Sequence, residues 1–189
     1  MASHRSPPEN DHPMVAPIEL ICRPDPKARP ASPAAPARVL VLGVGNVLMG
    51  DEGVGVHVLQ ALEHERSVEG VRLLDCGTGG INLLLEIEGA GQVLLIDATR
   101  DGQPAGTVTY LQPKTAGDLP RALTAHDFGL KDLFATAALL GGAPEMHLVT
   151  ISVEEIHPMC LELSPEVAAA VPEAVHTVRA LMARLAAGG

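Results

Sequence analysis

The chain has 189 residues, enough for one domain of ordinary size, and 47% of them are hydrophobic, enough for a sizeable core. Its formal net charge of −10 disfavours binding to nucleic acid or to an anionic membrane surface. No apolar run approaches the roughly 20 residues that span a bilayer, and the N-terminus lacks a positive region followed by a long apolar stretch, so we expect neither a membrane span nor a signal peptide.

The rare residue types indicate the kind of core and the redox compartment. The chain has no Trp, one Tyr and two Phe, so its core must be aliphatic. The three cysteines, Cys22, Cys76 and Cys160, are an odd number and show no CxxC spacing. This argues against a disulfide framework or a thiolate zinc site and fits a reducing cytoplasm.

The first 36 residues differ in composition from the rest of the chain. They contain nine of the sixteen prolines, and their charges balance, four basic against four acidic. A proline-rich stretch without hydrophobic periodicity is typical of a linker or an extension. We therefore expect a flexible proline-rich extension over residues 1–36 and one folded domain over residues 37–189.

Beyond this extension, apolar runs typical of strands alternate with helical patterns. The predicted strands are Arg38–Gly43, Val71–Asp75, Gln92–Asp97, Thr107–Leu111 and His147–Val153. The predicted helices are Asp51–Glu65, Ile81–Glu88, Phe128–Leu140 and a last helix with Ser164 as its cap, Pro165 at its first position and an end near Ala187. This alternation predicts an α/β fold, a three-layer α/β/α sandwich with a mostly parallel five-stranded sheet.

The most informative segment lies at the end of the first predicted strand. Residues 40–56 read Leu-Val-Leu-Gly-Val-Gly-Asn-Val-Leu-Met-Gly-Asp-Glu-Gly-Val-Gly-Val. A strand, a glycine turn and a helix start normally favour a phosphate, because the amides at a helix N-terminus attract anions. Here the turn delivers two carboxylates, Asp51 and Glu52, which would repel a phosphate and attract a cation. The segment therefore predicts a metal site.

Further candidate ligands follow other predicted strands. In open parallel sheets the site lies beyond the carboxyl ends of the strands. This places Glu52, Asp75 and Asp97 on one rim, and His126, in a loop before a helix, could reach it. A set of Glu, Asp and His suits nickel, zinc, iron or manganese. Three protein ligands leave positions open for water or substrate, and a bound ion could polarise a carbonyl group.

Each candidate also has a structural interpretation. Acids in a first helical turn, such as Asp51 and Glu52, are stabilised by roughly 0.3–1 kcal/mol each through the helix dipole. Asp97 could cap the next turn, Asp75 could be a turn residue, and His126 could lie on the surface.

Two other functions are compatible with these segments: dinucleotide binding and catalysis by a cysteine. Gly43 and Gly45 suggest a dinucleotide fingerprint, but Leu48 stands where its third glycine belongs, and the acidic pair would face the pyrophosphate. Cys76 could be a nucleophile, although the sequence shows no adjacent base.

The glycine-rich segment from Gly43 to Val56 resembles the N-terminal signature of the nickel–iron hydrogenase maturation endopeptidases. Four further segments resemble that family in the same order: the glycine turn at residues 75–80, the aspartate segment at 94–98, the histidine loop at 125–130, and the run into the last helix at 161–167. The resemblance covers about residues 38–187 and leaves out the proline-rich extension.

The resemblance implies one cut near the C-terminus of a hydrogenase large-subunit precursor, made after nickel insertion and releasing a short tail. It also implies that Glu52, Asp97 and His126 are both the metal contacts and the catalytic set. Nickel would be presented by the cysteines of the precursor rather than held permanently by the protease. Either the metal polarises the scissile carbonyl, or a carboxylate acts as base towards water. We expect a cytoplasmic monomer.

Two rival functions fit the same residues. An independent metallohydrolase of small peptides or amides would hold its own ion and need no nickel-loaded partner. A non-enzymatic hydrogenase assembly chaperone would bind the nickel-loaded subunit without cutting it.

Overall fold

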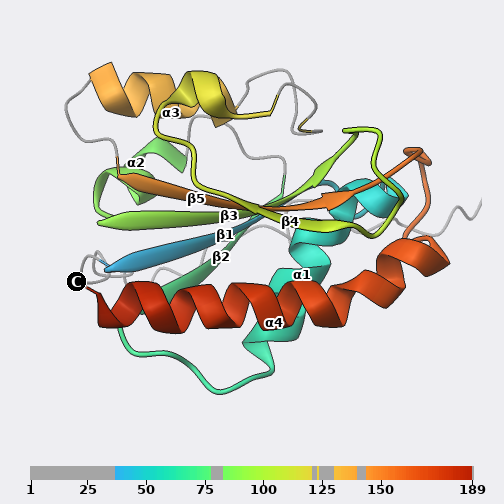
Figure 1. Ribbon diagram of the computed structural model, residues 1–189, viewed down its shortest axis with the longest axis horizontal. Coiled ribbons are helices and arrows are strands. Elements are labelled where there is room, and N and C mark those ends of the chain that lie inside the picture. The colour runs from blue at the N-terminus through green and yellow to red at the C-terminus, as the bar shows by residue number, and fades with distance from the viewer. Residues whose placement is uncertain (1–36, 78–82, 121–122, 124–129, 140–143, 189) are drawn as a thin grey trace, which may run out of the picture. The chain divides into compact units, whose positions relative to one another are not determined.

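One sheet organises the computed structural model, which describes residues 37–77, 83–120, 123, 130–139 and 144–188. Its strands are β1 (Val39–Val44), β2 (Val71–Gly77), β3 (Gln92–Thr99), β4 (Val108–Leu111) and β5 (Glu145–Ser152). They lie in the order β2-β1-β3-β5-β4 (Figure 1). All neighbouring pairs are parallel except β4 with β5, which is antiparallel. The predicted α/β fold with a mostly parallel five-stranded sheet is confirmed.

Helices cover both faces of this sheet, giving three layers. Helices α1 (Val54–Glu63) and α4 (Pro165–Ala187) lie on one face, and α2 (Leu83–Glu88) and α3 (Leu130–Leu139) lie on the other (Figure 1). Two short 3-10 helices, η2 (Gly50–Gly53) and η3 (Ala116–Asp118), interrupt the connections.

The hydrophobic core has two parts because successive residues of a strand point to opposite faces. Every residue of β1 is buried. Val39 and Val41 belong to the cluster formed with α1 and α4. Leu40 and Leu42 belong to the cluster on the opposite face, with Ile87 of α2. An apolar strand buried on both faces is what a central parallel strand requires.

Two element boundaries differ from the prediction and bear on the site. Asp51 and Glu52 lie in η2, and α1 begins only at Val54. Strand β3 continues to Thr99, so Asp97 lies inside the strand and not at its end. The reason is that β5 supplies backbone partners to the whole of this segment, Thr99 being paired with Ser152.

Several predictions fall on parts of the chain outside the described residues. These are the flexible extension at residues 1–36, most of the glycine turn after β2, and the histidine loop that includes His126. They stay predictions.

A close backbone contact fixes the start of α1 against the sheet. A Cβ atom on Gly55 would lie 2.3 Å from the carbonyl oxygens of both Val44 and Ile96. Only glycine can therefore occupy this position without moving the helix. The contact holds the first turn of α1, and with it η2, at the carboxyl ends of β1 and β3.

A polar network lies near the amino end of β5, on the face covered by α4. His147 is only 2% exposed, and its Nδ1 lies 2.9 Å from the hydroxyl oxygen of Tyr110 on β4. Arg184 of α4 donates a hydrogen bond of 3.1 Å to that oxygen and lies over the Tyr110 ring. Since the hydroxyl oxygen accepts from Arg184, its proton can be donated to Nδ1, which keeps the imidazole neutral.

Burial lowers the pKa of His147 below its ordinary value of 6.5, and Arg184 lowers it further, against an opposing effect of Glu145. The network therefore joins α4 to the edge strand β4 through Tyr110, which is also hydrogen-bonded to the buried His147.

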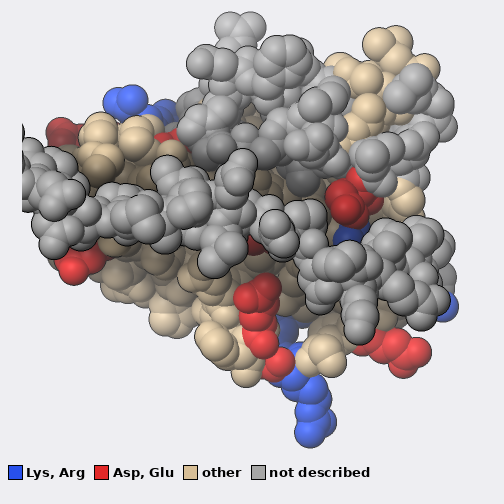
Figure 2. Space-filling view, turned by 180° about the vertical axis from the view of Figure 1, so that it is seen from behind, with Lys and Arg blue, Asp and Glu red and all other residues tan. Residues whose placement is uncertain are grey.

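The surface of the described residues carries charges of both signs. On the face seen in Figure 2, acidic side chains lie at several separate places, and basic side chains form no continuous patch. Within the described ranges, no helix has the length and apolar character to cross a membrane.

Candidate active site

Glu52 is held by the turn that follows β1. The side chain is 3% exposed. A Cβ atom on Gly45, which has a φ of +134°, would lie only 2.0 Å from the carbonyl oxygen of Glu52. The glycine turn therefore lies directly on the backbone of Glu52, and a residue with a side chain at Gly45 would displace it.

Asp97 lies in the carboxyl half of β3 and is fully buried. Its neighbours Ile96 and Ala98 pack in the cluster with α1 and α4, whereas Leu95 packs on the opposite face. Because side chains alternate along a strand, the carboxylate of Asp97 points to the side covered by α2 and α3.

The fold brings these two acids to the same end of the sheet. Strands β1 and β3 are parallel neighbours, and η2 contacts β3 directly. Glu52 and Asp97 therefore meet the prediction of a shared carboxyl rim. Buried carboxylates attract a cation more strongly than exposed ones, because the effective dielectric around them is lower.

The third predicted contact, His126, lies outside the described residues. The chain nevertheless reaches this rim three residues earlier, where Leu123 forms an isolated antiparallel bridge with Thr99 at the end of β3. Among the residues that the structure describes, no three His, Cys, Asp or Glu side chains form a group that could hold a metal ion. A role for His126 therefore stays a prediction.

Asp51 has a different environment from its neighbour Glu52. It is 4% exposed, and its Oδ1 accepts a hydrogen bond of 2.6 Å from the backbone N–H of Ser164. Ser164 is the N-cap residue of α4, as predicted, with Pro165 at the first position, but its own side chain makes no capping hydrogen bond. Asp51 and Glu52 were predicted to attract one cation together. In the structure Asp51 instead joins η2 to the start of α4, so the two acids have different environments.

The other rim candidates have structural roles. The Oδ1 of Asp75 accepts a hydrogen bond of 2.8 Å from the N–H of Gly77, which makes Asp75 a turn residue. Burial, together with smaller effects of the nearby carboxylates of Asp75 and Glu86, raises the pKa of the Cys76 thiol to about 12. A thiol that holds its proton this firmly is a poor nucleophile.

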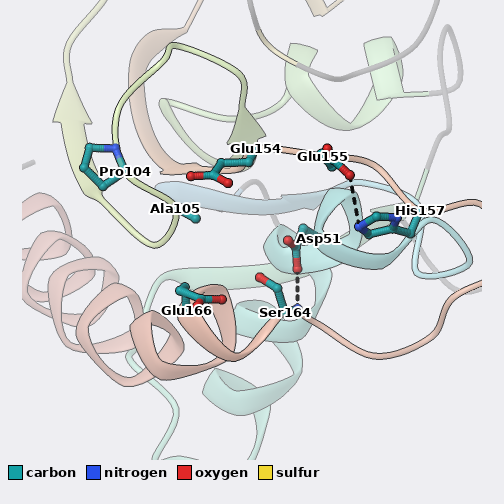
Figure 3. A pocket seen from close by; sticks show the side chains of 8 residues that line it. All are labelled: Asp51, Pro104, Ala105, Glu154, Glu155, His157, Ser164 and Glu166. Carbon is teal, nitrogen blue, oxygen red and sulfur yellow. Dashed lines mark hydrogen bonds and ion pairs between the residues drawn. The ribbon is translucent and has the colours of Figure 1, made fainter.

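Sequence analysis missed an acidic pocket beside η2. It has a volume of about 340 Å³, and Figure 3 shows Asp51, Glu154 and Glu166 on its walls. Glu155 and His157 also line it, and the Oε2 atom of Glu155 lies 3.7 Å from the Nε2 atom of His157. The signal in the sequence was the pair Glu154-Glu155 directly after a strand, at the same rim as the other acids.

Comparison with known proteins identifies the family of the chain. The family model described as hydrogenase maturation protease matches residues 56–180. The hydrogenase expression/formation protein HupD of Rhodobacter capsulatus is 36% identical over 156 residues, covering 77% of this chain and 73% of that protein. The hydrogenase 2 maturation protease of Escherichia coli K12 is 32% identical over 149 residues, covering 77% of this chain and 90% of that protein.

A solved structure gives the same result. The hydrogenase maturating endopeptidase HybD from E. coli is similar with a TM-score of 0.71 and 30% identity, over 78% of this chain and 93% of that chain. Similarity in sequence and similarity in fold thus point to the same family. The chain belongs to the hydrogenase maturation protease family.

Proposed function

We propose that this protein is an endopeptidase that removes a short C-terminal tail from the nickel-loaded precursor of a nickel–iron hydrogenase large subunit. The observation that carries the proposal is the burial of Glu52 and Asp97 at one end of the sheet, in a chain that belongs to the hydrogenase maturation proteases. Two of its relatives are named as a hydrogenase maturation protease and a hydrogenase maturating endopeptidase, which supports the proposal.

In the proposed mechanism nickel is part of the substrate. The cysteines of the precursor present the ion, and Glu52, Asp97 and His126 contact it, so that only a metal-loaded precursor is seated correctly. Water then adds to the carbonyl carbon of the scissile peptide, the C–N bond breaks, and the leaving amine takes up a proton. Either the metal polarises that carbonyl or a carboxylate removes the proton from water.

A cleavage assay tests this function. Purified precursors, nickel-loaded and nickel-free, are incubated with the wild-type chain, and the mass of the large subunit is measured. We expect a loss of mass at the C-terminus only with nickel. Asp97→Asn should lower the rate by at least about a hundredfold, as expected for loss of a group in direct contact with the reacting centre.

The matched control is Asp101→Asn. Asp101 is an exposed loop residue four positions away, and its Oδ1 accepts a hydrogen bond from the N–H of Gln103 that an asparagine can also accept. Normal cleavage by Asp97→Asn, with a folded protein, would exclude Asp97 from the chemistry.

The two rival functions give other results in the same assay. An independent metallohydrolase would cut short peptides without nickel in a partner and would retain an ion through purification. An assembly chaperone would bind the precursor and leave its mass unchanged.

We place the protein in the cytoplasm as a monomer. Cys76 and Cys160 are free thiols, which fits a reducing compartment. Fractionation of cells and sedimentation of the purified chain test these two proposals.

A further inference from the structure

Three exposed apolar side chains lie beside the candidate active site. Leu48 is 51% exposed, Met159 is 87% exposed and Leu161 is 63% exposed. They come from two segments that run side by side, because Met49 forms a parallel bridge with Cys160. Leu48 and Met159 are therefore adjacent across this pairing. We call Leu48, Met159 and Leu161 the apolar strip.

The backbone holds this strip in a defined shape. The N–H of Gly50 donates a hydrogen bond of 2.8 Å to the carbonyl oxygen of Cys160. Met159 has a φ of +61°, and it is the one residue other than glycine with a positive φ in the described part of the chain. A large apolar side chain kept exposed at a conformation that such residues rarely adopt is a feature of binding surfaces.

The acidic pocket adjoins the apolar strip. A Cβ atom on Gly50 would lie 3.6 Å from the Cβ of His157, a residue that lines the pocket. Eight residues line the pocket; four are carboxylates and none is Lys or Arg. The strip and the pocket are thus parts of one surface, which reaches Asp51, the residue next to Glu52.

One wall of the pocket is already arranged to receive a positive group. Asp51 is 4% exposed, and the hydrogen bond from Ser164 fixes its Oδ1. Its other oxygen points into the pocket, towards the side lined by Glu154 (Figure 3). A carboxylate held in a fixed orientation is a good acceptor for an ammonium or guanidinium group.

We propose that this surface seats an extended segment of the precursor whose Lys or Arg side chain enters the acidic pocket while a neighbouring apolar side chain lies on the apolar strip. The inference rests on the proposed function and names the chemistry of its substrate. Charge complementarity favours a cationic side chain, and the described residues hold no group that could bind a metal ion instead.

The acidic pocket lies next to the candidate active site, which explains how a peptide bound there could be positioned for cleavage. Asp51 lines the pocket and Glu52 belongs to the candidate active site, so a peptide held here lies close to the reacting centre. Binding energy from side chains that do not react orients the peptide that does.

The test is the cleavage of nickel-loaded precursor by Glu154→Gln combined with Glu166→Gln. Both side chains are exposed, so the fold should be unchanged. We expect KM to rise about fivefold to tenfold at low ionic strength, with a smaller change in kcat. The difference from wild type should shrink as salt is raised from about 0.05 to about 0.5 M, because salt screens exposed charges.

Two further variants complete the design. Glu63→Gln combined with Glu173→Gln removes the same charge from exposed positions on α1 and α4 outside the pocket, and should leave KM within about twofold of wild type. Leu48→Ser combined with Leu161→Ser tests the apolar strip, and should raise KM at every salt concentration, because apolar burial is not screened.

The outcomes separate this inference from the proposed function. If wild type cleaves the precursor and both the pocket and the strip variants keep its KM and its salt dependence, the surface does not bind substrate. The same conclusion follows if wild type forms a dimer that the strip variant abolishes while KM stays constant. If wild type cleaves no nickel-loaded precursor, the proposed function itself is wrong.

Discussion

The two ends of the central sheet each bury a polar side chain, and the two are used differently. His147 and Asp97 lie on the adjacent strands β5 and β3, three register positions apart. His147 faces α4 and is hydrogen-bonded to Tyr110, which also accepts a hydrogen bond from Arg184. It was not among the candidate residues predicted from the sequence. Asp97 faces the other side, at the end where the chain turns into loops. Burial is common to both side chains, so it is the position of Asp97 at the carboxyl end of a parallel strand that favours it as the candidate site residue.

The strongest test of this contrast is to replace Asp97 and His147 separately. Asp97→Asn should lower processing by at least about a hundredfold and leave the melting temperature nearly unchanged. His147→Gln should lower the melting temperature and leave processing within about twofold, because it lies at the other end of the sheet. Cleavage rates and thermal unfolding of the same preparations measure both. Equal losses of processing in the two variants would contradict the contrast.

The backbone contact at Gly55 gives the next largest effect. Gly55→Ala places a methyl group 2.3 Å from the carbonyl oxygens of Val44 and Ile96, so the start of α1 must move. We expect a loss of about 3 kcal/mol in the free energy of unfolding, measured by urea denaturation. Gly89→Ala is the matched control, since a Cβ there would have no atom within 4 Å. Equal stability of the two variants would show that α1 can shift freely.

At the other end, Tyr110→Phe removes the hydroxyl group between Arg184 and His147. We expect a loss of about 1–2 kcal/mol, because the buried Nδ1 of His147 loses its donor. Urea denaturation of this variant, of His147→Gln and of the double variant gives the coupling energy between the two side chains. A coupling near zero would show that the hydrogen bond between Tyr110 and His147 does not contribute to stability.

The smallest expected effect is a pH dependence of stability. Burial and Arg184 lower the pKa of His147 from 6.5, so the unfolded chain binds more protons than the folded one below about that pH. This contribution to stability is fully present above pH 6.5, decreases as the pH falls towards the lowered pKa, and is constant below it. The slope between about pH 6.5 and 5 should be smaller in His147→Gln. An unchanged slope would assign the dependence to other groups.

Much of the fold could be predicted because its signals are local. The apolar runs in β1 and β3 and the Ser164-Pro165 helix start are visible within a few residues, and all lie close to where they were expected. The extent of β3 was wrong, because the pairing of Thr99 with Ser152 joins residues far apart in the chain.

The site was predicted in part for the same reason. Glu52 and Asp97 could be placed on one rim because each lies at the carboxyl end of a predicted parallel strand or in the segment after it. The different environments of Asp51 and Glu52 could not be predicted, because the hydrogen bond from Ser164 to Asp51 links residues 113 positions apart in sequence. The acidic pocket brings together η2, the loop after β3, the segment after β5 and the start of α4, and no single segment reveals it.

The aliphatic core noted at the outset has a spectroscopic consequence. With no Trp and a single Tyr in the chain, the protein has almost no intrinsic fluorescence above the tyrosine band. An indole introduced by Leu161→Trp, at a position that is 63% exposed, would report on its own surroundings without background. The emission of that one side chain, recorded with a partner peptide that lacks tryptophan, would follow occupation of this surface in real time.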